Sequence, residues 1–128
     1  MVAFQRKRRL AGPDFDLLAG SDILYAPALD AGANGGVMAL ANVVPGLTAE
    51  IGDRFHSGDD DGARNLCASL VDLNQAITAR YGVPGLKEAM RYRDVPAGHV
   101  CAPHEPLKGD AVDEIHSLVD DALQPERA

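Results

Sequence analysis

Gly20-Ser21-Asp22 is the segment of the sequence best placed to do chemistry. It directly follows a short apolar run, Leu17 to Ala19, which is typical of a parallel strand buried on both faces. Proteins with parallel sheets build their sites at the carboxyl ends of such strands, where a hydroxyl and a carboxylate could hydrogen-bond a small ligand. The alternative is structural, because Ser21 or Asp22 could cap the helix that is predicted to follow.

His99, Cys101 and His104 are the other candidates, because all three residue types bind first-row metal ions. They lie close together in one predicted loop, but their spacing fits no regular zinc pattern. A fourth ligand would have to come from His56, His116 or a distant carboxylate. Solvated loop residues are therefore favoured, and neither a metal site nor a cofactor is expected.

Two runs of like charge have structural interpretations. Arg6-Lys7-Arg8-Arg9 is predicted to be the solvated face of a helix rather than an anion site. Asp59-Asp60-Asp61 is predicted to begin a helix, where negative charge is favourable, because no alternating calcium-ligand pattern follows it.

The elements that must position Gly20-Ser21-Asp22 form a βαβ unit. We expect strands at Phe15 to Ala19 and Gly36 to Leu40, joined by a helix that ends near Asp30 and turns at Gly32. The remaining elements are all predicted helices. They cover Ala3 to Leu10, Pro45 to Ser57, Asp59 to Ile77, Pro84 to Arg93 and Asp110 to Leu123, with a proline-rich loop from Val95 to Gly109.

Length, composition and charge limit the possible classes of protein. A chain of 128 residues that is 46% hydrophobic can bury one modest core. A net charge of −7 argues against nucleic acid as a partner, and no apolar run approaches the roughly 20 residues of a membrane span. Two cysteines are too few for a disulfide framework, so we expect a reducing compartment. The basic start has no apolar stretch after it and is not expected to be a secretory signal. Scarce lysine beside abundant aspartate indicates a salt-rich cytoplasm.

Several spaced motifs together resemble one known family. They are Gly20-Ser21-Asp22, Ala31-Gly32-Ala33, Gly35-Gly36-Val37-Met38, Asn42-x-x-Pro45 and Tyr81-Gly82-Val83-Pro84-Gly85-Leu86-Lys87-Glu88-Ala89-Met90. This pattern is similar to the end of the dihydrodipicolinate synthase and N-acetylneuraminate lyase family of class I aldolases. Within the family, the segment Val83 to Arg93 looks most like the 2-keto-3-deoxygluconate aldolase of salt-loving archaea.

The resemblance implies an α/β fold that is mostly helical overall. Residues 1–57 would be the last two βα units of a TIM (β/α)8 barrel, and residues 58–128 a C-terminal helical domain. A complete barrel needs about 250 residues, so the chain is expected to be a C-terminal fragment of a family member.

The chemistry that the resemblance implies is that of a lyase acting on 2-keto acids such as pyruvate or 2-keto-3-deoxy sugar acids. In the family a lysine forms a Schiff base with the keto group, and the protonated imine stabilises the carbanion formed when the neighbouring C–C bond breaks. That lysine, the proton-shuttling tyrosine and the carboxylate-binding loop do not lie in this sequence. Lys7 and Lys87 are not credible substitutes, so no catalytic residue is expected here and the chain alone should be inactive.

The substrate-binding residues implied by the resemblance are Gly20, Ser21, Asp22 and Met38. The first three would lie beside the distal, hydroxylated part of the substrate, with Asp22 both capping a helix and touching the ligand. Met38 would contribute its main-chain carbonyl near the imine, although a plain core methionine is the alternative. Ala39 stands where neuraminate-specific members keep a serine, and this departure weakens the case for neuraminate as the substrate.

A second hypothesis is a non-catalytic remnant or assembly module. Its open sheet would dock onto a separately encoded N-terminal portion or onto another copy, and family members are commonly homo-oligomers. The helices after residue 58 are expected to bury their apolar stripes against one another, so the strands keep an exposed apolar face. That face should drive self-association or leave the first 45 or so residues loosely ordered. The sequence leaves open the exact substrate, the reaction direction and whether Met1 is the true start.

Overall fold

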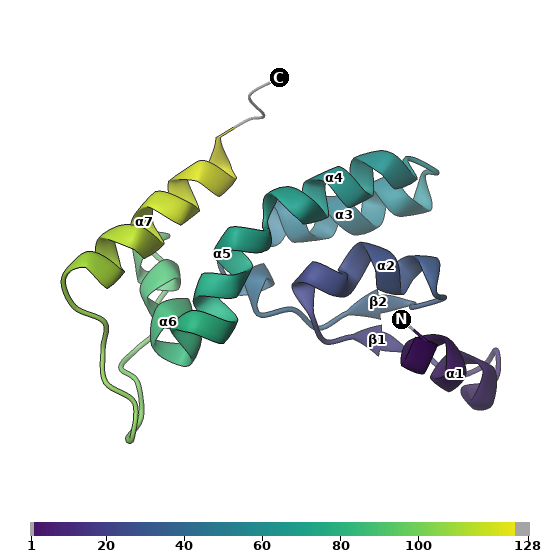
Figure 1. Ribbon diagram of the computed structural model, residues 1–128, viewed down its shortest axis with the longest axis horizontal. Coiled ribbons are helices and arrows are strands. Elements are labelled where there is room, and N and C mark those ends of the chain that lie inside the picture. Colours follow the sequence, from purple (N-terminus) through teal and green to yellow (C-terminus); the bar gives the residue numbers. More distant parts are fainter. Residues whose placement is uncertain (1, 125–128) are drawn as a thin grey trace.

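The computed structural model describes residues 2–124 and is mostly helical (Figure 1). The elements are α1 (Val2–Ala11), β1 (Leu18–Ala19), the 3-10 helix η1 (Asp22–Leu24), α2 (Tyr25–Asp30), β2 (Gly35–Gly36), the 3-10 helix η2 (Leu40–Asn42), α3 (Pro45–His56), α4 (Asp60–Ser69), α5 (Val71–Gln75), the π-helix η3 (Ala76–Arg80), α6 (Gly82–Tyr92) and α7 (Asp110–Leu123). Helices α1 and α7 lie at opposite ends of the long axis.

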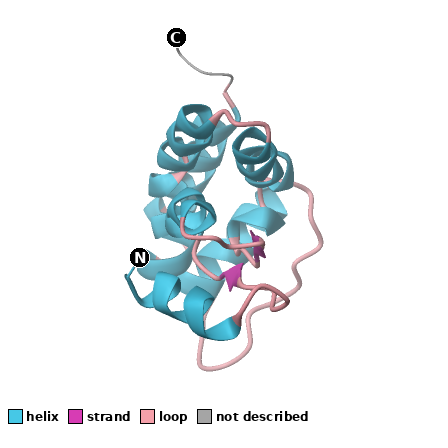
Figure 2. Cartoon of the chain, turned by 90° about the vertical axis from the view of Figure 1, so that its right-hand side faces the viewer, coloured by secondary structure: helices cyan, strands magenta, loops and turns pink. Residues whose placement is uncertain are grey.

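The predicted βαβ unit is present, with shorter strands than expected. Strand β1 pairs in parallel with β2, Leu18 opposite Gly35 and Ala19 opposite Gly36, and α2 is the crossover between them. The expected strands, Phe15 to Ala19 and Gly36 to Leu40, were too long. Residues 2–124 provide no third strand to extend the ladder, and the chain turns into η2 soon after β2. Figure 2 shows the two small arrows among the helices.

Neither Ser21 nor Asp22 caps a helix through its side chain, which corrects the capping prediction. Ser21 is the N-cap of η1 but makes no side-chain hydrogen bond, and the N-cap of α2 is Leu24. The reason is that the chain first makes a 3-10 turn, in which the Leu24 amide donates to the Ser21 carbonyl at 3.2 Å. This turn places Asp22 at the start of η1, where its side chain is buried, three residues before α2 begins.

The long helix predicted from Asp59 to Ile77 starts as expected but breaks at Leu70. Asp59 is the N-cap of α4 and accepts a hydrogen bond from the Gly62 amide at 3.0 Å. Leu70 leaves helical geometry (φ −94°, ψ 0°), so α5 points away from α4 (Figure 1). The break lets buried residues on both sides of it, Ala63 and Cys67 before it and Leu73 after it, face one core.

One apolar core joins the first and second halves of the chain. It combines residues of α2, η2 and α3 with residues of α4 to α7, namely Ala26, Leu40, Val43, Val44, Ile51, Ala63, Cys67, Leu70, Leu73, Ala76, Ile77, Ala89, Ile115 and Val119. The helices after residue 58 thus bury their stripes together, as predicted, but they also cover α2 and the segment after β2. The core crosses the predicted boundary between residues 57 and 58, and the division into two domains stays a prediction.

The end of the molecule that carries α1 is less well buried. A second, small cluster there consists of Ala19, Ala28 and Met38, with Phe4 of α1 packed against it. Helix α1 itself has no buried residue. Its cations Arg6, Lys7 and Arg9 are exposed as predicted, whereas Arg8 is half-buried.

Arg8 fastens α1 to the turn that follows α2. Its guanidinium donates to Asn34 Oδ1 at 3.0 Å and to the Gly12 carbonyl. Gly32 has a positive φ of 91°, and a Cβ there would lie 3.2 Å from the Arg8 side chain. The same Asn34 oxygen also accepts the Leu17 amide at 2.9 Å, so this turn holds the start of β1.

Large apolar side chains are exposed around α1 and the sheet. They are Val2, Leu10, Phe15, Leu18 and Val37. None of the helices within residues 2–124 combines the length and the apolar character that crossing a membrane requires.

Candidate functional site

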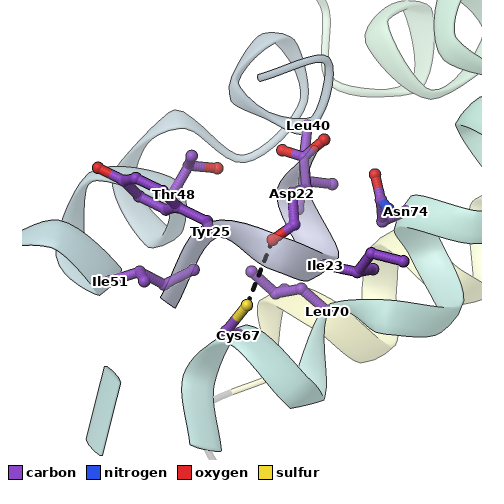
Figure 3. Close-up of a pocket in the computed structure, with 9 residues that line it drawn as sticks. All are labelled: Asp22, Ile23, Tyr25, Leu40, Thr48, Ile51, Cys67, Leu70 and Asn74. Carbon is purple, nitrogen blue, oxygen red and sulfur yellow. Dashed lines mark hydrogen bonds between the residues drawn. The ribbon is translucent and has the colours of Figure 1, made fainter. Parts of the chain in front are cut away.

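A small pocket of about 10 Å³, roughly enough for one water molecule, lies beside the carboxyl end of β1 and is partly open to solvent. Six elements meet there, because η1 and α2 follow β1, η2 follows β2, and α3, α4 and α5 pack against them. Its lining residues are Asp22, Ile23, Tyr25, Leu40, Thr48, Ile51, Cys67, Leu70 and Asn74 (Figure 3).

Asp22 is the one predicted site residue that lines this pocket. It is only 8% exposed, and its Oδ1 has no hydrogen-bond partner among the described residues. Burial raises the pKa of the Asp22 carboxyl, and the backbone amides of Leu40, Asp22 and Ala39 oppose that rise. A carboxyl in this environment favours its neutral form more than an exposed aspartate does.

The main chain at Asp22 is fixed to the helical part of the fold. The Cys67 thiol of α4 donates to the Asp22 carbonyl at 3.3 Å. One turn earlier on α4, Arg64 pairs with Asp30 at the end of α2 at 3.2 Å. The segment from η1 to the end of α2 is therefore fixed to α4 at both of its ends.

The other predicted site residues lie around the pocket but not in it. Gly20 is exposed, and Ser21 is half-buried in extended conformation (φ −140°, ψ 120°). Met38 is buried against Ala19 and Ala28, as a core methionine would be. The structure thus brings Asp22 alone into the pocket, and the substrate-binding roles of all four residues stay predictions.

Asn74 and Thr48 are pocket residues that the sequence reasoning missed. Asn74 is 4% exposed, and its Oδ1 has no partner among the described residues. Thr48 is buried and donates to the Val44 carbonyl at 3.1 Å. A signal for Asn74 was present, because it is a polar residue beside Leu73 in an otherwise apolar helical stripe.

The candidate metal ligands do not come together. His99, Cys101 and His104 are all exposed in the loop before α7. Within residues 2–124, no group of three or more histidine, cysteine or carboxylate side chains is arranged to hold a metal ion. His56 instead lies 2.7 Å from the Gly52 carbonyl, and His116 lies 3.0 Å from Glu88 and stacks on a tyrosine.

The lysines also lie away from the pocket. Lys87 donates to the His99 carbonyl at 2.6 Å and so fastens α6 to the following loop. Lys7 is on the exposed face of α1, and Lys108 is exposed next to α7.

Residues 1–122 match the dihydrodipicolinate synthetase family. The chain belongs to this family. The resemblance seen in the motifs is therefore confirmed at the level of the family.

Curated relatives support the same assignment. The chain is 35% identical over 100 residues to an uncharacterized DapA-like lyase of Halobacterium salinarum, covering 78% of this chain and 33% of the relative. It is 31% identical over 102 residues to the 4-hydroxy-tetrahydrodipicolinate synthase of Pelobacter propionicus, covering 80% and 35%. The chain spans about a third of the length of these relatives.

Solved structures show the same fold. Dihydrodipicolinate synthase DapA-2 from Bacillus anthracis gives a TM-score of 0.86 at 23% identity, covering 93% of this chain and 41% of the other. N-acetylneuraminate lyase from Fusobacterium nucleatum, complexed with pyruvate, gives 0.85 at 21% identity, covering 97% and 42%. The structural neighbours are TIM-barrel proteins of this family, and the chain covers about two fifths of each.

Proposed function

We propose that this chain forms the C-terminal part of a carbon-carbon lyase that acts on 2-keto acids through a lysine Schiff base. Membership of the family over residues 1–122 is the observation that carries the proposal. The relatives include a DapA-like lyase, and one solved neighbour is a lyase complexed with pyruvate. The imine-forming lysine would come from outside this sequence, because all three lysines here lie away from the strand ends.

In this proposal β1 and β2 are the last two strands of the barrel, and the helices after residue 58 are the appended domain. The parallel pairing of β1 with β2 across α2 supports it. Asp22 would bind substrate hydroxyls, with Gly20 and Ser21 shaping the wall beside it. The Met38 carbonyl would lie near the imine, which acts as the electron sink for the breaking C–C bond.

The substrate class we favour is a 2-keto-3-deoxy sugar acid in a salt-rich cytoplasm. The Halobacterium relative and the low lysine content support the salt-rich setting, and the resemblance of the segment Val83 to Arg93 to the sugar-acid aldolases supports the substrate class. The charge of −7 over 128 residues fits an acidic surface that stays hydrated in high salt.

A chimera tests the lyase proposal. The chain replaces the corresponding last third of the Halobacterium relative, and borohydride traps any imine formed with pyruvate. We expect a reduced covalent adduct and cleavage of 2-keto-3-deoxygluconate with the chimera, and neither with the chain alone. In the chimera, Asp22→Ala should keep the pyruvate adduct and lose most of the sugar-acid cleavage.

The unmodified relative serves as the positive control. If the relative forms the adduct while a folded chimera does not, the chain does not contribute part of a lyase active site. An adduct on Lys7 or Lys87 of the chain alone, with turnover, would equally contradict the proposal.

The second candidate function is a non-catalytic assembly module. The exposed Phe15, Leu18 and Val37 beside a two-stranded sheet favour it, because such a surface suits a docked strand from a separate N-terminal portion or a second copy. The coding sequence upstream separates the two candidates. A continuous frame that reaches a lysine-bearing strand supports the enzyme, and an upstream stop codon supports the module.

A further inference from the structure

Two buried acceptor oxygens in the pocket have no hydrogen-bond donor among the described residues. Asp22 Oδ1 and Asn74 Oδ1 are both buried and have no hydrogen-bond partner among the described residues. Figure 3 shows the carboxyl of Asp22 and the amide of Asn74 on the same side of the pocket. Buried acceptors are normally paired, so two of them in one pocket require an explanation.

The other side chains of the lining do not provide that hydrogen. The lining holds no arginine, lysine or histidine. The Thr48 hydroxyl already donates to the Val44 carbonyl, and the Cys67 thiol donates to the main-chain oxygen of Asp22. The Tyr25 hydroxyl points away from the carboxyl in Figure 3, toward Gly52, where a Cβ would lie 2.9 Å from it.

We propose that Asp22 is held as a neutral carboxylic acid whose hydroxyl donates to the amide oxygen of Asn74. One proton then satisfies both oxygens, and no charge is buried in an apolar pocket. Asn74 is a positioning residue in this arrangement: helix α5 fixes both the orientation and the protonation of the side chain at the end of β1. The pair stands whether or not the chain belongs to an active lyase.

The burial that raises the pKa of Asp22 agrees with this proposal. Because the folded-state pKa lies above the unfolded one, the stabilisation is fully present below the unfolded pKa. It is lost as pH rises through the folded-state pKa, where a buried charge would face the amide oxygen. The other titratable groups facing the pocket are the phenol of Tyr25 from α2, whose pKa is also raised by burial and by Asp53, and the thiol of Cys67 from α4.

The test uses the complete chain, ¹³C-labelled at aspartate carboxyl groups, and follows the Asp22 signal by NMR from about pH 4 to 7, below the ordinary range of thiols and phenols. The Asp22→Asn variant assigns the signal by its disappearance. In the native chain we expect a carboxyl that stays protonated at a pH where the exposed aspartates are ionised.

The Asn74→Ala variant separates positioning from simple packing. It removes the acceptor and admits water, so the Asp22 midpoint should fall by about one pH unit or more, a tenfold or larger change in proton affinity. Asp72→Asn, which alters an exposed carboxyl on the same helix, is the matched control and should leave the midpoint unchanged.

Two results overturn the proposal. An Asp22 ionised throughout this range in the folded native chain would show that Asn74 presents its NH₂ group or that a water supplies the hydrogen. An unchanged midpoint in folded Asn74→Ala would show that Asn74 only packs. If Asn74→Ala does not fold, the Asp22→Asn variant decides, because the new amide can donate to Asn74 without titrating. The urea midpoint of the native chain should fall as pH rises toward neutral, and that of Asp22→Asn should not.

Discussion

Gly85 is a residue where one added methyl group would disturb the fold. It is buried in α6, and a Cβ there would lie 2.6 Å from Tyr81 Cβ and 3.3 Å from the Ala76 carbonyl oxygen. Neither atom can move freely, since both belong to the adjoining helical turn. We expect Gly85→Ala to lower the free energy of unfolding by about 1–3 kcal/mol, measured by urea denaturation.

Gly46 provides the matched control, because it is also a helical glycine but has nothing within 4 Å of an added Cβ. Gly46→Ala should be neutral or stabilise by up to about 1 kcal/mol, since alanine favours helix. Equal effects at the two positions would show that the contact at Gly85 relaxes without cost.

Sequence reasoning at the residue scale found Asp22 but not its partner. Asp22 stands out because it follows an apolar run directly, which is a local signal. Asn74 lies 52 positions later in the chain, and only the break at Leu70 directs α5 toward η1. That break depends on packing between distant helices, which local propensities do not encode.

Helix α4 depends on the cap at its first turn. Asp59 accepts the Gly62 amide at 3.0 Å and also lies 3.4 Å from Arg54 of α3. Asp59→Ala should therefore lower the free energy of unfolding by about 0.5–2 kcal/mol in urea denaturation. Asp59→Asn keeps the cap and loses only an exposed ion pair, so it should recover most of that loss.

A large loss in Asp59→Asn would instead assign the main contribution to the ion pair with Arg54. Repeating both measurements in high salt distinguishes the two, because salt screens the ion pair and leaves the cap in place.

At the element scale the helices were predictable and the irregularities were not. The range Asp110–Leu123 was predicted as it stands in the structure, because its apolar residues recur on one face and its ends carry clear signals. The predicted strands were too long, since the length of a strand depends on the strand that pairs with it. The π-helix η3 (Ala76–Arg80) has no local sequence signature and lies where α5 meets α6.

The end that carries α1 and the sheet is expected to associate with other copies. Leu18 and Val37 are 54% and 70% exposed, and both belong to or follow an open strand. Light scattering at low salt should show oligomers, and Leu18→Lys or Val37→Lys should reduce them, because charge on an edge strand opposes pairing. Val83→Lys, which alters an exposed valine on α6, is the control and should leave association unchanged.

Hydrogen exchange should rank the same parts of the molecule. Amides of α1, β1 and β2 should exchange fastest, because these elements contribute no residue to the main core and pack against the small cluster around Met38. Those of α5 and α7 should exchange slowest, since Leu73, Ile115 and Val119 are central to the main core. A sharp monomer with well-protected strands would show that this end closes more tightly than its exposed side chains indicate.

The different burial of the two thiols allows the opening rate of the pocket to be measured. Cys101 is exposed, whereas Cys67 is buried beneath the carbonyl of Asp22. A thiol-reactive dye should label Cys101 at once and reach Cys67 only when α4 separates from the loop after β1. In a Cys101→Ser variant, the labelling rate at Cys67 would then report how often the pocket opens, even under conditions where circular dichroism shows no unfolding.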